Sequence, residues 1–125
     1  MKYKLVQKGK PGDKEAPKKF YASPIKTGNV TSKTIAKDIA GRSSLTSGDV
    51  SNVLQNLVEI LPQKLIDGNS IQLGDFGSFR ISFSSEGVDT ADKFTTDKIR
   101  GIKVIFTPSI EFKKALGDIK FEIEK

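Results

Sequence analysis

Two short motifs in the second half of the chain constrain its fold more than any other feature. The first is LGDFGSFRIS at residues 73–82, in which Gly74 and Gly77 lie on either side of an aspartate and a phenylalanine. Because glycine adopts the backbone angles that tight turns need, a strand is expected to turn sharply there and continue as a second strand. The other motif, FTPSIEFKKAL at residues 106–116, predicts a strand that passes directly into a short helix.

Two helices are expected before the first motif. Thr31 is the expected N-cap of a helix that runs to about Gly41. Thr46 and Asp49, three positions apart, match a capping box at the start of a second, longer helix. Pro62 interrupts this second helix near its end, so a kink or a new start is expected there. Its apolar side chains repeat at helical spacing and need a partner surface; they are Val50, Val53, Leu54, Leu57, Val58, Leu61 and Leu65.

The same motifs place the strands of the chain's central part. Residues 70–73, 79–83 and 102–106 have strand patterns, and the polar stretch 84–101 joins the last two. At the end of the third strand, Thr107 is the expected N-cap of the short helix. The proline that follows it fits the first helical position, where its missing N–H costs nothing.

Both ends of the chain carry further strand patterns. Residues 3–7 and 18–23 predict two strands around a loop rich in glycine, proline and lysine, and residues 119–123 alternate apolar and charged side chains. The last segment is expected to pair with one of the first two, so that its glutamates lie beside their lysines. Because the N-terminal segment contains several apolar side chains, we expect strands that dock on the body rather than a disordered basic tail.

Composition excludes several kinds of function. The 125 residues are 36% hydrophobic and 29% charged, which is typical of one folded domain with appendages. Cysteine and histidine are both absent, which removes thiol chemistry, disulfides and the commonest general base. Since the acidic residues show no metal or acid–base spacing, we expect no enzyme, no cofactor and no small-molecule substrate. No stretch matches a membrane span or signal peptide, so a cytoplasmic protein is expected.

The positive charge is concentrated at one end of the sequence. Residues 1–30 contain eight lysines and two acidic residues, which accounts for the entire net charge of +6. Residues 31–125 contain 13 basic and 13 acidic residues and are therefore neutral. A polyanionic partner is indicated, and the N-terminal segment is the part most suited to attract it.

From Thr31 to Leu116, the order helix, helix, GDFGSF hairpin, arm, strand and FTPS-type helix resembles the HU and integration host factor family of bacterial histone-like DNA-binding proteins, closest to its Bacteroidetes HU-related branch. The resemblance implies an α+β fold. Two protomers would intertwine as a homodimer, each with two N-terminal helices, a three-stranded antiparallel sheet with a β-ribbon arm at about residues 84–101, and a short C-terminal helix. Residues 1–30 and 117–125 lie outside the family's minimal pattern and would add terminal strands.

The resemblance also implies a ligand and a set of contact residues. The protein would be nucleoid-associated and would bind double-stranded DNA mainly through backbone phosphates, with little sequence specificity. The sheet face, the arm and the short helix would carry the contacts, and the N-terminal charge adds two lysines. The implied residues are Arg80, Ser82, Ser84, Lys93, Lys98, Arg100, Lys103, Lys113, Lys114, Lys18 and Lys19. The amides at the start of the short helix are a further expected phosphate site.

The arm departs from the family in two ways. None of the five prolines lies within residues 84–101, so the wedge with which the family kinks DNA is absent. The same stretch contains four acidic and three basic residues, a net charge of −1. Val88 and Phe94 are candidates for a substitute wedge, and the N-terminal lysines are candidates for supplying the missing charge.

Two other functions stay open on the sequence. A dimeric scaffold that kept the fold and lost DNA binding fits the neutral body and the acidic arm. A helix-turn-helix regulator fits residues 34–54, but the second helix there exposes no lysine or arginine and is longer than a recognition helix requires. The salt dependence of duplex binding separates DNA binding from the scaffold.

Overall fold

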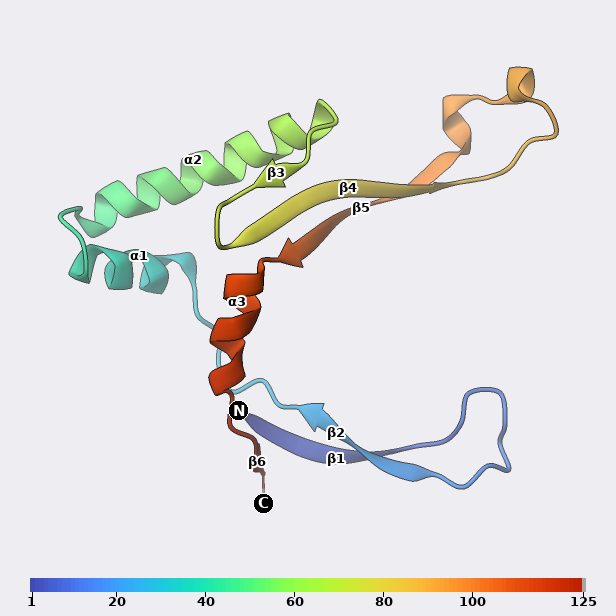
Figure 1. Ribbon diagram of the computed structural model, residues 1–125, viewed down its shortest axis with the longest axis horizontal. Coiled ribbons are helices and arrows are strands. Elements are labelled where there is room, and N and C mark those ends of the chain that lie inside the picture. Colours follow the sequence, from blue (N-terminus) through green and yellow to red (C-terminus); the bar gives the residue numbers. More distant parts are fainter. Residues whose placement is uncertain (125) are drawn as a thin grey trace.

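Helices and strands of this α+β protein spread over an open, extended shape (Figure 1). The structure is a computed structural model that describes residues 1–124. Within this range its helices and strands, in chain order, are β1 (Lys2–Lys8), β2 (Lys19–Pro24), α1 (Ser32–Gly41), α2 (Ser47–Ile66), β3 (Ile71–Gln72), β4 (Gly77–Ser85), β5 (Ile99–Pro108), α3 (Ile110–Ala115) and β6 (Glu122–Ile123). The mixed class predicted from the sequence is confirmed.

Side-chain caps fix the start of the first two helices, as predicted. The N–H of Thr34 donates to Oγ1 of Thr31 at the start of α1. At the start of α2, the N–H of Asp49 donates to Oγ1 of Thr46 and the N–H of Thr46 donates to the Asp49 carboxylate, both at 3.1 Å. The hydrogen bond from the Thr46 backbone N–H to the carboxylate, and after it the Thr46 side chain, lower the pKa of Asp49. The ionised carboxylate therefore stabilises the fold at neutral pH, and this contribution is lost as pH falls through the lowered pKa.

We expect Thr46→Ala to lower the free energy of unfolding by about 1 kcal/mol, because the N–H of Asp49 loses its acceptor. Urea unfolding at pH 7 measures this difference. Asp49→Asn should also be less stable than the wild type at pH 7, and the two should converge as pH falls below the lowered pKa of Asp49. Ser51→Ala, on an exposed position of the same helix, is the control. Equal midpoints for Thr46→Ala and Ser51→Ala would contradict the prediction.

The second helix continues through its proline. α2 is one continuous helix to Ile66, so the new start considered at Pro62 does not occur. Pro62 lies in the last turns, where only one intrahelical bond is lost and the flanking turns keep theirs. The helix ends at Ile66: the N–H of Gly68 donates to the carbonyl of Leu65 at 2.9 Å, and Gly68 has a φ of 90°.

The body of the protein contains the antiparallel sheet β3–β4–β5. The turn into β4 lies where the first motif predicts it, since Gly74 and Gly77 both have positive φ and the N–H of Leu73 donates to the carbonyl of Gly77. β4 and β5 are longer than the predicted strands because their ladder continues outward into the arm. The arm itself, between Ser85 and Ile99, contains two single 3-10 turns.

The start of α3 differs from the prediction. Its N-cap is Ser109, whose Oγ accepts a hydrogen bond from the N–H of Phe112 at 3.0 Å, and not Thr107. Thr107 belongs to β5, where it pairs with Ser78, and the proline after it is the last residue of the strand. Ladder pairing therefore outweighs the local capping preference of Thr107. One of the amides expected to bind phosphate, that of Phe112, is already occupied by Ser109.

The two sequence motifs meet in space. Oγ of Ser109 donates to the carbonyl of Asp75, and the N–H of Ser109 donates to the carbonyl of Phe76 at 3.3 Å. Four phenylalanine rings pack around this junction, with centroids 5.0–6.1 Å apart; they are Phe76, Phe79, Phe106 and Phe112. The GDFGSF turn, β5 and α3 are thus held together by aromatic packing and backbone bonds.

The two ends of the chain form a second sheet, in the order β2–β1–β6. The two predicted N-terminal strands are present: β1 and β2 form an antiparallel hairpin, and β6 pairs in parallel with β1. β6 covers only two residues, fewer than the predicted strand at residues 119–123, and a 3-10 turn at Leu116–Asp118 follows α3. The terminal strands pair with one another and not with β3–β4–β5, so the expectation that they dock on the body of the same chain is wrong.

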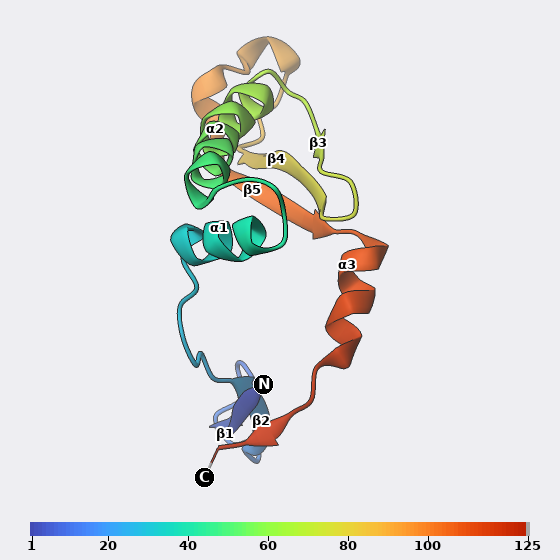
Figure 2. The ribbon, with the colours of Figure 1, turned by 90° about the vertical axis from the view of Figure 1, so that its left-hand side faces the viewer.

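Side chains are poorly buried within one chain. Among residues 1–124, the buried apolar side chains are Ala36, Val50 and Leu65. Other members of the α2 stripe stay open to water: Val53 is 59% exposed and Val58 63%. Figure 2, turned by 90° from Figure 1, shows one reason: the terminal sheet lies apart from α1, α2 and the central sheet along the long direction of the view.

Candidate nucleic-acid interface

One face of the β4–β5 ladder gathers several of the predicted contact residues. Ser82 lies opposite Lys103, and Arg80 lies opposite Ile105. Directly opposed residues of an antiparallel pair project from the same face, as do residues two apart in one strand. Arg80, Ser82 and Lys103 therefore share a face, and neither β4 nor β5 contains an acidic residue.

A β-bulge adds Arg100 to this face. Arg100 and Lys103 are three positions apart, so a regular strand would point them to opposite sides. Between the pair Ser82–Lys103 and the pair Ser84–Arg100, however, β5 contains one residue more than β4. Gly101, with a φ of 68°, provides the left-handed conformation for this bulge. We call the resulting surface the β4–β5 face; its residues are Arg80, Ser82, Ser84, Arg100 and Lys103.

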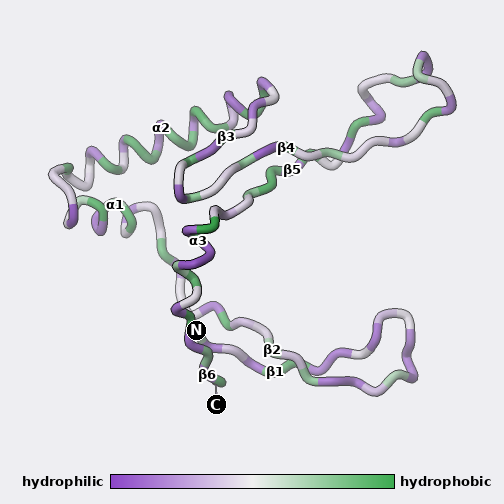
Figure 3. Tube along the Cα trace, in the orientation of Figure 1, coloured by the Kyte–Doolittle hydropathy of each residue, from purple (hydrophilic) through white to green (hydrophobic). Residues whose placement is uncertain are grey.

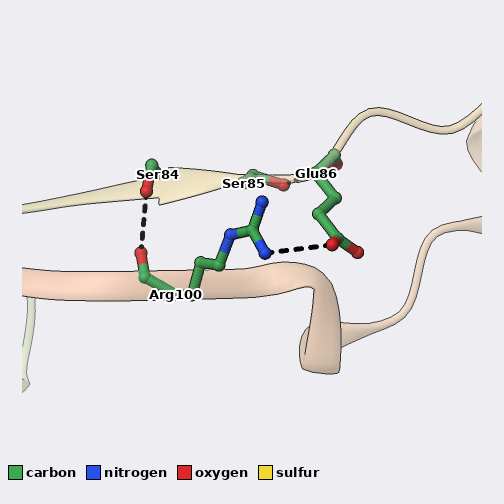
Figure 4. A network of polar contacts seen from close by, with 4 residues as sticks. All are labelled: Ser84, Ser85, Glu86 and Arg100. Atoms are coloured by element: carbon green, nitrogen blue, oxygen red, sulfur yellow. Dashed lines mark hydrogen bonds and ion pairs between the residues drawn. The ribbon is translucent and has the colours of Figure 1, made fainter.

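Arg100 is held by a neighbour on the arm (Figure 4). Its Nη1 lies 3.0 Å from Oε1 of Glu86, and Oγ of Ser84 donates to the carbonyl of Arg100 at 3.2 Å. The side chains of Arg100 and Glu86 are 67% and 47% exposed, so water screens their attraction and the pair is weak. A phosphate placed over the β4–β5 face would compete with Glu86 for this guanidinium.

The other predicted residues of the body lie apart from this face. Lys93 and Lys98 each end a 3-10 turn of the arm, and Lys113 and Lys114 lie in the last turn of α3. Figure 1 places the arm turns and α3 at opposite ends of the β4–β5 ladder. The structure therefore brings five of the predicted residues together and leaves these four at the two margins.

The candidates for a wedge both lie in the arm, outside its strands. Phe94 follows the first 3-10 turn and is 39% exposed, whereas Val88 is half-buried. The arm around them carries the acidic residues noted in the sequence. Phe94 is thus the more accessible of the two, and its insertion into DNA stays a prediction.

Lys18 and Lys19 belong to the terminal hairpin, where Lys18 precedes β2 and Lys19 begins it. Lys19 lies opposite Lys8 of β1. Among the N-terminal lysines, the sequence interpretation named only Lys18 and Lys19 as contact residues and left the others as a general source of charge. In the structure β1 runs from Lys2 to Lys8, so Lys2, Lys4 and Lys8 all belong to the strand and share one face. The predicted strand, residues 3–7, left out Lys2 and Lys8, and their common face was therefore missed.

Ion pairs and metal ligands are scarce in the part of the chain that the structure describes. Arg100–Glu86 is its one salt bridge. No three side chains of the types that bind metals come together within residues 1–124. Over the same range, no helix combines the length and the apolar character needed to cross a bilayer. The basic side chains are therefore largely uncompensated by neighbours, which favours an anionic ligand.

Comparison with known proteins assigns the family. The model of the HU-HIG family, described as an HU domain fused to wHTH, Ig or glycine-rich motif, matches residues 1–123, and the chain belongs to this family. A crystal structure of a proposed bacterial DNA-binding protein from Bacteroides vulgatus ATCC 8482 has a similar fold, with a TM-score of 0.64 and 15% sequence identity. The similarity covers 98% of this chain and 47% of that one, so the chain spans about half its length. No curated protein matches the chain.

Proposed function

We propose that this protein is a histone-like, nucleoid-associated protein that binds double-stranded DNA through its backbone phosphates, with little sequence specificity. The observation that carries the proposal is the β4–β5 face, where two arginines, a lysine and two serine hydroxyls gather on strands free of acidic residues. Such groups bind phosphate oxygens and do not by themselves read the bases. Membership of the HU-type family and the similarity to a proposed DNA-binding protein support DNA as the ligand.

A two-fold homodimer is part of the proposal. The chain exposes 10715 Å² of surface. A compact monomer of 13.7 kDa would expose only about 6,600 Å², so about 4,100 Å² is in excess. Obligate dimers bury roughly 2,000–5,000 Å² in total over both partners, so a dimer interface would cover part of this excess. The half-exposed apolar stripe of α2 is the surface best suited to pairing.

DNA bending would require an apolar wedge other than proline. Phe94, in the arm and partly exposed, is the side chain best placed to act in this way. The acidic arm and the Arg100–Glu86 pair instead favour the second candidate function, a dimeric scaffold that does not bind DNA. Affinity for duplex as a function of salt discriminates between the two.

For the wild-type protein, we expect the affinity for a plain duplex to fall steeply between 50 and 200 mM salt. Each phosphate that is neutralised contributes about 0.9 to the slope of log K against log salt. Arg80→Gln/Lys103→Gln removes two cations per chain and should lower the slope of a dimer by about three to four. Fluorescence anisotropy with a labelled duplex measures both slopes.

Lys33→Gln/Lys37→Gln is the matched control, since it removes the same charge from exposed positions of α1. Its slope should stay within about one of the wild-type value. A wild-type affinity that does not depend on salt would favour the scaffold. Equal losses of slope in the two double variants would mean that the net charge, and not the β4–β5 face, controls binding.

A further inference from the structure

The terminal hairpin is amphipathic, with its lysines on one face. The register of β1 and β2 places Lys4 opposite Ser23 and Lys8 opposite Lys19, so these side chains project to the same side as Lys2. We call this the lysine face; its basic residues are Lys2, Lys4, Lys8 and Lys19. The register places most of the apolar side chains on the other side, which holds Tyr3, Leu5, Phe20, Ala22 and Pro24, whereas Val6 and its partner Tyr21 lie among the lysines.

The apolar side of the hairpin indicates which of its two faces packs against protein and which stays exposed to a ligand. With Phe121 it lines a hollow of about 610 Å³, and Phe20 and Leu5 are 66% and 53% exposed. The free energy falls when apolar side chains leave water, so this side of the hairpin favours contact with protein. The lysine face is then the side of the hairpin that stays in water and is free to meet a charged ligand.

The charge of the hairpin is not compensated within the described chain. Residues 2–24 contain seven lysines and two acidic residues, a net charge of +5. None of these lysines takes part in a salt bridge among residues 1–124. Lys2 lies opposite Glu122 in the β1–β6 pair, yet the two form no ion pair. Of the two acids, Asp13 accepts the N–H of Glu15 at 3.0 Å within the loop.

The hairpin and the β4–β5 arm project from the same side of the molecule, to the right in Figure 1, and Figure 2 shows both extending away from the viewer. Figure 3 shows that hydrophilic residues dominate the outer part of the hairpin. The arm has a net charge of −1 over residues 84–101, whereas the hairpin is strongly basic. A rod-shaped polyanion that met the β4–β5 face would thus find most of its counter-charge on the hairpin.

We propose that the β1–β2 hairpin is a second DNA-binding arm, whose lysine face and loop bind the phosphodiester backbone of the duplex that contacts the β4–β5 face. The inference rests on the proposed DNA-binding function and extends it to a site outside the HU-like core. Lysine contacts to phosphate carry no sequence information, so the hairpin adds affinity and salt dependence without specificity. An anionic membrane offers similar charge, but the shared orientation of hairpin and arm favours a ligand that reaches both.

The test compares two triple variants of the full chain. Lys4→Gln/Lys8→Gln/Lys19→Gln removes three charges from the lysine face, and Lys33→Gln/Lys37→Gln/Lys64→Gln removes three from the helices. In a dimer the first variant should lower the slope of log K against log salt by up to about five and weaken duplex binding at least tenfold at 150 mM salt. The helix variant should lose no more than about twofold.

The loop provides a second test that touches no strand residue. Lys10→Gln/Lys14→Gln/Lys18→Gln should also lower the slope of log K against log salt. This result does not depend on whether Lys4→Gln/Lys8→Gln/Lys19→Gln folds stably. If the wild type binds duplex and both hairpin variants keep the slope of the helix variant, the second arm is refuted while DNA binding stands. If the wild type itself shows no salt-dependent binding, the proposed function fails as well. The second arm would also be refuted if the two hairpin variants lost binding to phosphatidylserine vesicles but bound duplex as tightly as the wild type does.

Discussion

Gly77→Ala is expected to lower the free energy of unfolding by about 3 kcal/mol or more. A Cβ at this position would collide with the carbonyl oxygen of Thr107 and would lie 2.8 Å from Cε2 of Phe106 and 3.0 Å from Cα of Pro108. The Thr107 and Pro108 atoms belong to the backbone of β5, which cannot withdraw without breaking the ladder to β4. The φ of 145° adds strain, since residues other than glycine rarely adopt this backbone angle.

Alanine variants at two other glycines separate the steric collision from the backbone strain. Gly74→Ala meets open space at a φ of 53°, so it should cost only the left-handed strain of about 1 kcal/mol. Gly87→Ala meets open space without a positive φ and should stay within about 0.5 kcal/mol of the wild type. Urea unfolding at a fixed protein concentration measures all three. If Gly77→Ala cost no more than Gly74→Ala, the close packing against β5 would have no energetic role.

The helices could be predicted because their signals are local. Thr46 and Asp49 reach each other within one turn, so three positions of sequence are enough to define the start of α2. The error at α3 has the opposite origin. Thr107 has the local features of an N-cap, but it pairs with Ser78, 29 positions earlier in the chain, and no local pattern reports that pairing.

The candidate site shows the same division between local and long-range information. Arg80, Ser82 and Ser84 alternate within one strand, so the sequence predicts their common face. The place of Arg100 could not be predicted, because the spacing of three from Lys103 points to opposite faces until the bulge at Gly101 is known. Its ion pair with Glu86 likewise depends on how the arm folds back.

The terminal sheet combines both kinds of information. The strand patterns at the two ends of the chain predicted strands, but they offered two partners for the last one. Pairing with β1 brings the two ends of the chain together, and the N-terminal amine donates to the carbonyl of Lys120 at 2.7 Å. The parallel register could not be predicted, because it depends on the path of the chain from α3 back to β1. The separate position of this sheet is what makes the hairpin available as a second arm.

Val53→Lys/Ile60→Lys should abolish the dimer. The two side chains are 59% and 47% exposed, and because they are seven positions apart, Ile60 lies on the same side of α2 as Val53, at one edge of the apolar stripe. In a dimer that buries this edge, four unpaired ammonium groups would lose their hydration, at a cost that exceeds what an interface of apolar contacts can return. Because obligate dimers have no stable folded monomer, the variant should lose its cooperative unfolding transition as well as its partner.

Light scattering coupled to size exclusion, with thermal unfolding followed by circular dichroism, measures both losses. The wild type should have about twice the 13.7 kDa mass of one chain. Gln55→Lys/Gln63→Lys adds the same charge to exposed positions on the polar side of α2 and should keep both the mass and the transition. A wild type that runs as a 13.7 kDa monomer with a sharp transition would refute the dimer. So would a Val53→Lys/Ile60→Lys variant that behaves like this control. In either case the excess exposed surface of α2 would need a different partner.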